Sequence, residues 1–224
     1  MLSFVSFSER LARGELKNTS AVEQTNLGEI CPEYMDSILS LTNQGLKDLS
    51  TRFALVKKQV DLIFQDLTYR YAMDSAGIGT YLDDSQTEDF DGDDFVKILN
   101  IWDADGLDHP IDTNGHIMTP TFNSIRFTKA KMTELGDKVR IRYQSKHPDI
   151  TESDVIDLPP NLETALQLYV ASQYISHMNG PEHTTKGDAY YAAYLRHIGE
   201  DESRNLSSTS EIAEDTRFQD RGFV

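Results

Sequence analysis

Two aspartate-rich runs come nearest to a metal-binding pattern in this chain. Residues 89–94 read DFDGDD and residues 103–106 read DADG. A calcium loop of the EF-hand type needs ligands at its first, third and fifth positions, glycine at the sixth and glutamate at the twelfth. In each run the glycine comes two places too early, and no glutamate stands at the twelfth place. We therefore predict turns with solvated carboxylates at both runs, and no metal site.

Nucleophiles and other metal ligands are scattered along the chain rather than clustered. Cys31 is the single cysteine, which excludes an internal disulfide and a cysteine-paired metal site. The six histidines show no His-Glu-x-x-His spacing, and residues 77–79 lack the third glycine of a dinucleotide-binding loop. The sequence contains no phosphate-binding loop and no Gly-x-Ser-x-Gly motif. We predict no catalytic residue and no cofactor, although a serine triad assembled only by the fold stays open.

The overall charge argues against nucleic-acid binding. The 224 residues carry a formal net charge of -16, which makes a surface that repels phosphate. Hydrophobic residues make up 38% and charged residues 26%, an ordinary soluble balance. No apolar run approaches the roughly 20 residues of a membrane helix, and the first residues lack a basic, signal-like start. We expect synthesis in the cytoplasm and no membrane partner.

The acidic residues are most concentrated between residues 83 and 94. This stretch holds seven acidic side chains and no basic one. Like charges at this density resist packing, so a solvated loop is the first interpretation. The second is functional, because an acidic wall suits a channel through which DNA slides without binding.

Helical spacing marks the N-terminal part of the chain. Residues 7–13 are expected to form a short helix with Ser8 near its N-terminal cap, followed by irregular polar residues 14–29. A longer helix is expected to start at Pro32, because proline suits the first helical turn. Its apolar residues follow helical spacing: Met35, Ile38, Leu39, Leu46, Leu49 and Phe53. Gly45 weakens the middle of this helix and leaves a break there open.

Short apolar runs, some of them alternating, predict strands in the middle of the chain. Residues 53–67 indicate a strand with some helical character. Residues 95–102, 123–128 and 139–143 are separated by Gly and Asp turns and predict a small antiparallel sheet or sandwich. The last of these strands alternates between an apolar and a basic face: Val139, Ile141 and Tyr143 against Arg140 and Arg142.

Residues 157–204 show the pattern of a helical hairpin. Pro159 and Pro160 lead into the first helix, Asn161 can cap it, and Asn-Gly-Pro at 179–181 ends it. The second helix is expected to start at Thr184 or Thr185. Two apolar stripes can pack as an antiparallel pair: Leu162, Ala165, Leu166, Tyr169 and Val170 on the first helix, and Ala189, Tyr190, Ala193, Tyr194 and Ile198 on the second. Tyr191 lies off this stripe and is expected to face a neighbour.

Together these elements predict an α+β fold that is mainly helical. We expect an antiparallel helix bundle or hairpin with a small inserted antiparallel β-domain and extended termini. The expected parts are an N-terminal arm at 1–30, a helical core from 31–82 and 151–204, a β-rich insertion at 83–150 and a C-terminal tail at 205–224. The tail has a polar spacer before aromatic and arginine residues, and it either folds on a partner or frays.

Two segments of the hairpin carry a resemblance to a known family. DLPPNLETALQLY at 157–169 and DAYYAAYLR at 188–196 follow a strand that ends at Pro148. This combination is similar to the head-to-tail adaptor proteins of tailed bacteriophages, also called connector or neck proteins. The similarity extends over residues 30–204. The β-rich insertion departs from the shortest adaptors, which are nearly all helical, and resembles larger versions.

The resemblance implies a structural protein of the virion neck that catalyses nothing. Such proteins form a ring, usually of twelve copies, beneath the portal and continue the DNA channel. The implied partners are the portal protein, the following tail or nozzle protein, and further copies of the same chain. DNA would pass through the channel without specific binding.

Carried over to this chain, the resemblance implies portal-binding residues and luminal or tail-facing residues, and the pattern of the second hairpin helix adds candidate subunit-interface residues. The candidate portal-binding residues in the tail are Arg217, Phe218, Arg221 and Phe223. The candidate subunit-interface residues, aromatic and amphipathic as interfaces favour, are Tyr190, Tyr191 and Tyr194. The candidate luminal or tail-facing acidic residues are Asp89, Asp91, Asp93 and Asp94.

Two other classes of function stay open. A small enzyme of mixed α and β structure would gather ionisable side chains in a concave pocket. A scaffold protein would bind one partner through the C-terminal tail. Oligomeric state separates the classes, because a ring is expected only of an adaptor.

Overall fold

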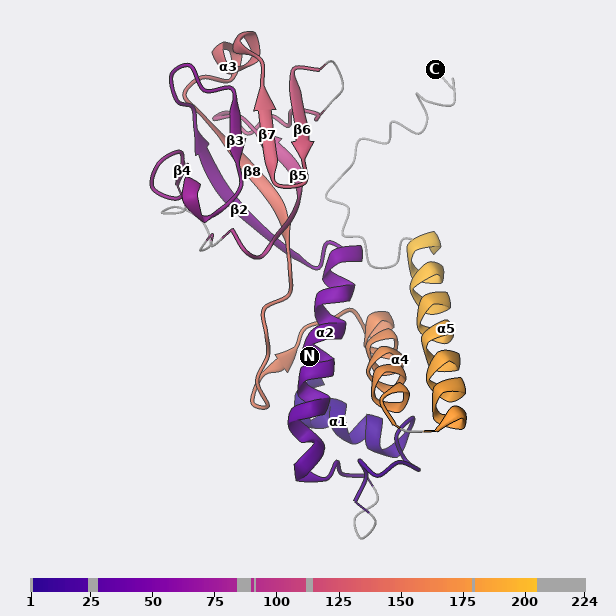
Figure 1. The fold of residues 1–224 in the computed structure, drawn as a ribbon. Helices are drawn as coiled ribbons and strands as arrows, with labels where there is room; N and C mark the ends of the chain where they lie inside the picture. The colour runs from indigo at the N-terminus through magenta and orange to yellow at the C-terminus, as the bar shows by residue number, and fades with distance from the viewer. Residues whose placement is uncertain are drawn as a thin grey trace.

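The computed structural model describes residues 2–23, 28–83, 90, 92–111, 115–178 and 180–204, with the backbone alone for 202–204. These residues form a helical lobe and a β-lobe (Figure 1). The structure is 43% helical and 25% strand, with its strands in three antiparallel sheets. The expectation of a mainly helical bundle is therefore wrong. Several strands are too short to show an alternating pattern, so much of the β-structure leaves no signal in the sequence.

The helical lobe incorporates the N-terminus in its core. Its elements are β1 (Leu2–Ser3), α1 (Phe4–Arg13), α2 (Pro32–Arg52), β9 (Val155–Ile156), α4 (Pro160–Ser176) and α5 (Pro181–Arg204). β1 pairs antiparallel with β9, and Phe4, Phe7 and Leu11 are fully buried. Because burying these side chains removes much apolar surface from water, the N-terminal residues pack into the core instead of forming an extended arm.

Local capping decides where these helices begin. The Ser3 hydroxyl accepts a hydrogen bond from the Ser6 N–H at 3.2 Å, so α1 begins at Phe4 instead of the predicted Phe7. Pro159 is the N-cap of α4, with Asn161 already inside the helix. α5 begins at Pro181 instead of Thr184 or Thr185, because proline fits a first helical turn.

α2 runs without a break through Gly45. A Cβ atom at this position would lie 2.6 Å from Leu166 Cδ1 and 2.8 Å from Tyr169 Cδ1, both on α4. The absent side chain lets the two helices approach closely. The helix therefore tolerates the conformational cost of glycine in exchange for packing against α4.

The β-lobe is built from two sheets that share one core. Its elements are β2 (Val56–Ile63), β3 (Arg70–Ala72), the 3-10 helix η1 (Ser75–Gly77), β4 (Leu82–Asp83), β5 (Phe95–Trp102), β6 (Ile117–Thr121), β7 (Ser124–Phe127), α3 (Lys129–Leu135) and β8 (Lys138–Ser145). The strand orders are β4-β2-β8-β5 and β3-β7-β6. Val60 and Ile141 from the first sheet and Ile125 from the second belong to one buried cluster.

The pairing of β2 with β8 sets the start of the β-lobe. Val56 pairs with Ser145, and Ile63 pairs with Lys138 at the other end of an antiparallel ladder. The lobe thus begins at β2, whereas the β-rich insertion was predicted to start at residue 83. The predicted alternation of β8 is confirmed, because Val139, Ile141 and Tyr143 are all buried.

Hydrogen bonds join the two lobes where α2 ends. The buried Gln144 side chain of β8 donates through Nε2 to the Ser50 carbonyl and, at 3.1 Å, to the Phe53 carbonyl. The His147 N–H donates to the Ser50 hydroxyl at 3.0 Å. The two bonds from Gln144 satisfy carbonyl groups at the C-terminal end of α2, and the bond from His147 adds a second tie between the lobes at the same place.

Candidate functional site

The outer face of α5 is the first candidate interface. Among the side chains of α5 that the structure describes, only those of Tyr194, Ile198 and Asp201 are buried, together with Gly187. These positions are three, four or seven residues apart, so they face one side of the helix. Figure 1 shows α5 at the edge of the helical lobe, beside α4. The opposite side of α5 is therefore exposed, including the predicted stripe residue Ala189.

The three predicted interface tyrosines lie in three environments. Tyr194 is fully buried, and its hydroxyl donates a hydrogen bond to the Asp48 carboxylate. Tyr190 is partly buried, with Lys186 Nζ 5.7 Å from its ring centroid. Tyr191 is 39% exposed. Tyr194 thus belongs to the core, which leaves Tyr191 as the tyrosine best placed for a neighbour.

Leu195 extends the exposed apolar surface around Tyr191. Its side chain is 42% exposed and lies one helical turn from Tyr191. The two side chains form a small exposed apolar surface on one face of α5. The Tyr191 ring also lies 5.9 Å from the Tyr194 ring, measured between centroids. Tyr191 and Leu195 are hereafter called the α5 outer pair.

The acidic candidates are only partly described. Asp89 and Asp91, and the tail candidates Arg217, Phe218, Arg221 and Phe223, lie outside the described residues. The Asp94 carboxylate accepts hydrogen bonds from Lys58 Nζ at 2.7 Å and Ser145 Oγ at 2.6 Å, with its side chain 15% exposed. Asp94 therefore stabilises the β-lobe and differs from the solvated carboxylate expected here. Asp93 is exposed, and its carbonyl accepts a hydrogen bond from Lys146 Nζ at 3.0 Å.

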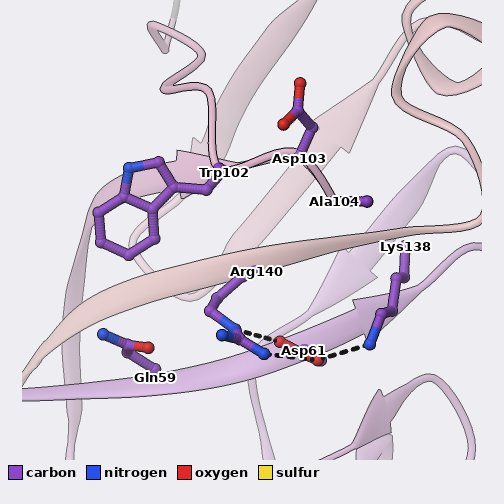
Figure 2. Close-up of a pocket in the computed structure, with 8 residues that line it drawn as sticks. Gln59, Asp61, Trp102, Asp103, Ala104, Lys138 and Arg140 are labelled. Carbon is purple, nitrogen blue, oxygen red and sulfur yellow. Dashed lines mark hydrogen bonds and ion pairs between the residues drawn. The ribbon is translucent and has the colours of Figure 1, made fainter.

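A second candidate site lies on the outer face of the four-stranded sheet. Asp61 of β2 pairs with Arg140 of β8, and Arg140 pairs with Trp102 of β5, so one row crosses three strands. Arg140 donates to Asp61 through Nε at 2.7 Å and Nη2 at 3.2 Å, and Lys138 Nζ donates at 3.0 Å (Figure 2). This ion cluster lines a cavity of about 400 Å³.

The ion cluster keeps Asp61 charged although its side chain is only 2% exposed. Burial by itself would raise the pKa of this carboxyl. The hydrogen bonds and positive charges of Arg140 and Lys138 together outweigh burial, so the pKa lies below its ordinary value of 3.8. The pairing also raises the pKa of Arg140.

The predicted turn at residues 103–106 is confirmed. The Asp103 carboxylate accepts hydrogen bonds from the Asp105 and Leu107 N–H groups at 2.9 and 3.0 Å, as aspartate commonly does in turns. His109 Nε2 lies 2.8 Å from the other carboxylate oxygen. This contact, followed by the backbone hydrogen bonds, lowers the pKa of Asp103.

Asp61 is the residue of this site that sequence reasoning missed. Arg140 was placed on the basic face of its strand, but Asp61 lies 79 positions earlier in the chain. The available signal was a single acidic residue between the apolar Val60 and Leu62, on the face away from the core. The partner of Asp61 cannot be predicted from this signal, because only the register of β2 on β8 brings Asp61 opposite Arg140.

Comparisons with known proteins do not assign either site. Neither a protein-family model nor a curated protein matches this chain. Among the helices of the described residues, none is both long and apolar enough to span a membrane.

Proposed function

We propose that this protein is a head-to-tail adaptor of a tailed bacteriophage. In that role, copies of the chain form a ring between the portal and the tail in the virion neck. DNA passes through the ring without specific binding, which suits a chain with a net charge of -16. The segments that resemble adaptors, 157–169 and 188–196, fall largely within α4 and α5, which pack against each other.

The one-sided burial of α5 is the observation that carries the proposal. The helix uses one face to pack on α4 and exposes the α5 outer pair on another, with Tyr191 39% and Leu195 42% exposed. A ring subunit needs surfaces that repeat from copy to copy rather than one deep pocket. In the proposed ring, the α5 outer pair lies against the neighbouring copy.

The remaining partners are assigned to the tail and to the acidic stretch. In this proposal Arg217, Phe218, Arg221 and Phe223 contact the portal, since arginine and aromatic side chains dominate many protein interfaces. Asp89, Asp91 and Asp93 face the channel or the next tail protein. Asp94 is not included, because Lys58 and Ser145 hold its carboxylate within the β-lobe.

The direct test is to mix the purified protein with isolated portal and image the product by electron microscopy. The proposal predicts a closed ring seated on the portal. Using the portal is essential, because an adaptor can stay monomeric until it meets that partner. No association at any salt concentration would reject the proposal and favour a scaffold protein or an enzyme.

Substitutions on α5 test the subunit interface. We expect Tyr191→Glu combined with Leu195→Glu to abolish ring closure, because each buries an unpaired charge between copies. The matched control is Phe122→Glu, which places the same charge on a side chain that is 74% exposed on the β-lobe. Rings that form equally well with the double variant would show that α5 is not the interface.

Truncation tests the portal contact separately. Removing residues 205–224 is expected to abolish binding to the portal while α5 and the rest of the described fold remain. Circular dichroism and a thermal melt of the truncated chain check that it is folded. Unchanged portal binding would reject the assignment of the tail residues and leave the α5 interface untouched.

A further inference from the structure

The cavity beside Asp61 has the dimensions of a small-ligand site. Its volume of about 400 Å³ falls within the range of known ligand pockets. The side chains of two neighbouring strands line it, namely Gln59 and Asp61 of β2 with Lys138 and Arg140 of β8. The remaining lining residues are Trp102 of β5 and, in the turn that follows, Asp103, Ala104 and Gly106 (Figure 2).

Both cations of the cavity keep hydrogen-bond donors beyond those used on Asp61. A guanidinium carries five N–H donors and an ammonium carries three. Arg140 uses Nε and Nη2 on Asp61, and Lys138 uses one donor of Nζ. The Arg140 and Lys138 side chains are 42% and 50% exposed, so their remaining donors face the solvent of the cavity.

The two carboxylates of the cavity, by contrast, are engaged within the protein. Both oxygens of Asp61 accept hydrogen bonds from the two cations, and the side chain is only 2% exposed. One oxygen of Asp103 accepts two backbone N–H groups, and His109 lies against the other. The formal charges of the two cations and the two carboxylates balance, so the cavity offers a ligand the remaining N–H donors of Arg140 and Lys138. A carboxylate complements such charged donors best.

An aromatic side chain also lines the cavity. Trp102 lines the cavity, and Arg142 Cζ lies 5.7 Å from its ring centroid. The rest of the indole offers an apolar surface next to the bound charge. The net charge of -16 repels polyanions at long range, so a ligand with one charge and an apolar neighbour fits better than nucleic acid.

We propose that this cavity binds a carboxylate that carries an adjacent apolar or aromatic group. Arg140 and Lys138 hold the carboxylate, Gln59 offers a further amide, and the apolar group lies against Trp102. The carboxylate belongs either to a free small molecule or to an acidic side chain in a segment of another protein. This inference does not depend on the adaptor role.

Trp102 makes the proposal directly measurable, because it is the single tryptophan of the chain. We would titrate the full chain with 3-phenylpropionate and follow tryptophan fluorescence. The matched ligand is 3-phenylpropionamide, which has the same ring without the charge. We expect a saturable change with the carboxylate and an affinity at least about tenfold lower for the amide, because charge-assisted hydrogen bonds are the stronger ones.

Two further probes separate the sources of the carboxylate. One is the capped peptide Ala-Glu-Phe-Ala, with Ala-Gln-Phe-Ala as its control. The other is inorganic phosphate, which has charge but no apolar group and is expected to bind more weakly than 3-phenylpropionate. Tighter binding of the Glu peptide than of the free acid indicates a protein partner, and the reverse order indicates a small molecule.

Variants of the ion cluster have opposite expected effects. Arg140→Gln and Lys138→Gln each should weaken 3-phenylpropionate binding, by about tenfold for Arg140 because it loses a charged donor group. Asp61→Asn should tighten binding severalfold, because it removes the competing carboxylate from both cations. Arg126→Gln, which makes the same change at an exposed position of β7, should have no effect.

Three results would overturn the proposal. The first is that no probe gives a saturable fluorescence change, and the second is that the acid and the amide bind with equal affinity. The third is that the Asp61→Asn variant binds 3-phenylpropionate more weakly than the wild type. A thermal melt checks that each variant is folded. If Arg140→Gln does not fold, the test uses the half-exposed Lys138 instead. An unchanged affinity of Lys138→Gln for 3-phenylpropionate then rejects the site.

Discussion

Three tyrosines on α5 differ in environment although they stand within little more than one helical turn. Tyr194 is fully buried, Tyr190 is partly buried and Tyr191 is 39% exposed. Burial, followed by the hydrogen bond to the Asp48 carboxylate, raises the pKa of Tyr194 far above its ordinary value. The Tyr194 hydroxyl therefore stays protonated and acts as a donor.

Removing that donor should destabilise the helical lobe. We expect Tyr194→Phe to lower the free energy of unfolding by about 1–2 kcal/mol, because a hydrogen bond to a charged group is lost inside the core. Arg52 Nε still donates to Asp48 at 2.9 Å, which limits the loss. Urea denaturation measures the effect. Tyr191→Phe is the control, and an equal loss in that variant would contradict the burial difference.

The lowered pKa of Asp61 predicts a pH dependence of stability. The folded protein keeps this carboxylate charged at pH values where the unfolded chain, with a pKa near 3.8, takes up a proton. Its contribution is therefore complete above that pH and is lost as the pH falls through the lower folded-state pKa. We expect Asp61→Asn to cost about 1–2 kcal/mol at pH 7 and progressively less below pH 4.

Urea denaturation of both proteins between pH 7 and pH 2 checks this prediction. The wild-type and Asp61→Asn stabilities should converge as the medium becomes acidic. A difference that stays constant over the whole range would mean that the ion cluster does not supply the stabilisation.

At the scale of elements, glycines decide how closely helices pack. Gly45 faces Leu166 and Tyr169 of α4, whereas Gly199 of α5 has nothing within 4 Å of its missing Cβ. We expect Gly45→Ala to destabilise the protein by about 1 kcal/mol, because overpacking exceeds the gain in helix propensity. Gly199→Ala should stabilise it by about 0.5–1 kcal/mol.

The two alanine variants form a matched pair for thermal unfolding. Their midpoints should shift in opposite directions from that of the wild type. A rise in both midpoints would show that α2 and α4 relax without cost, and the close approach at Gly45 would then have no energetic importance.

Elements with a clear local signal were predictable from the sequence. β5 was predicted at its observed bounds, Phe95–Trp102, and α2 was predicted to start at Pro32, because a short apolar run before turn residues and an N-terminal proline are local signals. α3 was missed, since Lys129–Leu135 is too short to establish an apolar stripe. β1 and β9 have two residues each, which is too few to show a pattern.

At the scale of the whole molecule, Gln144 links the two lobes. Its side chain donates to two carbonyl groups at the end of α2, and both bonds lie in the buried junction. We expect Gln144→Ala to lower stability by about 2 kcal/mol and to loosen the coupling between the lobes. The physical reason is that the β-lobe then keeps fewer bonds to the helical lobe, chiefly the one from His147.

Two optical probes report the lobes separately. Circular dichroism at helix wavelengths follows mainly the helical lobe, and fluorescence of Trp102 follows the β-lobe. The unfolding midpoints from the two probes should lie further apart in Gln144→Ala than in the wild type. Gln167→Ala on α4 is the control, and the same separation there would reject the junction as the coupling element.

The local pattern of the sequence determined which side chains face the core, and the composition determined the net charge. The alternation of β8 was sufficient to place Val139, Ile141 and Tyr143 in the core, because side chains on a strand repeat with a period of two. Helix starts at proline followed in the same way from local geometry, and the net charge of -16 is a property of composition alone.

Only the tertiary structure decided which distant residues meet. Asp61 reaches Arg140 across 79 positions, and Tyr194 reaches Asp48 across 146. Local periodicity specifies a face of a strand or helix but not the partner of that face, and closing a longer loop costs little additional entropy. The cavity beside Trp102 and the exposed α5 outer pair therefore depend on strand register and helix packing, which operate between elements rather than within them.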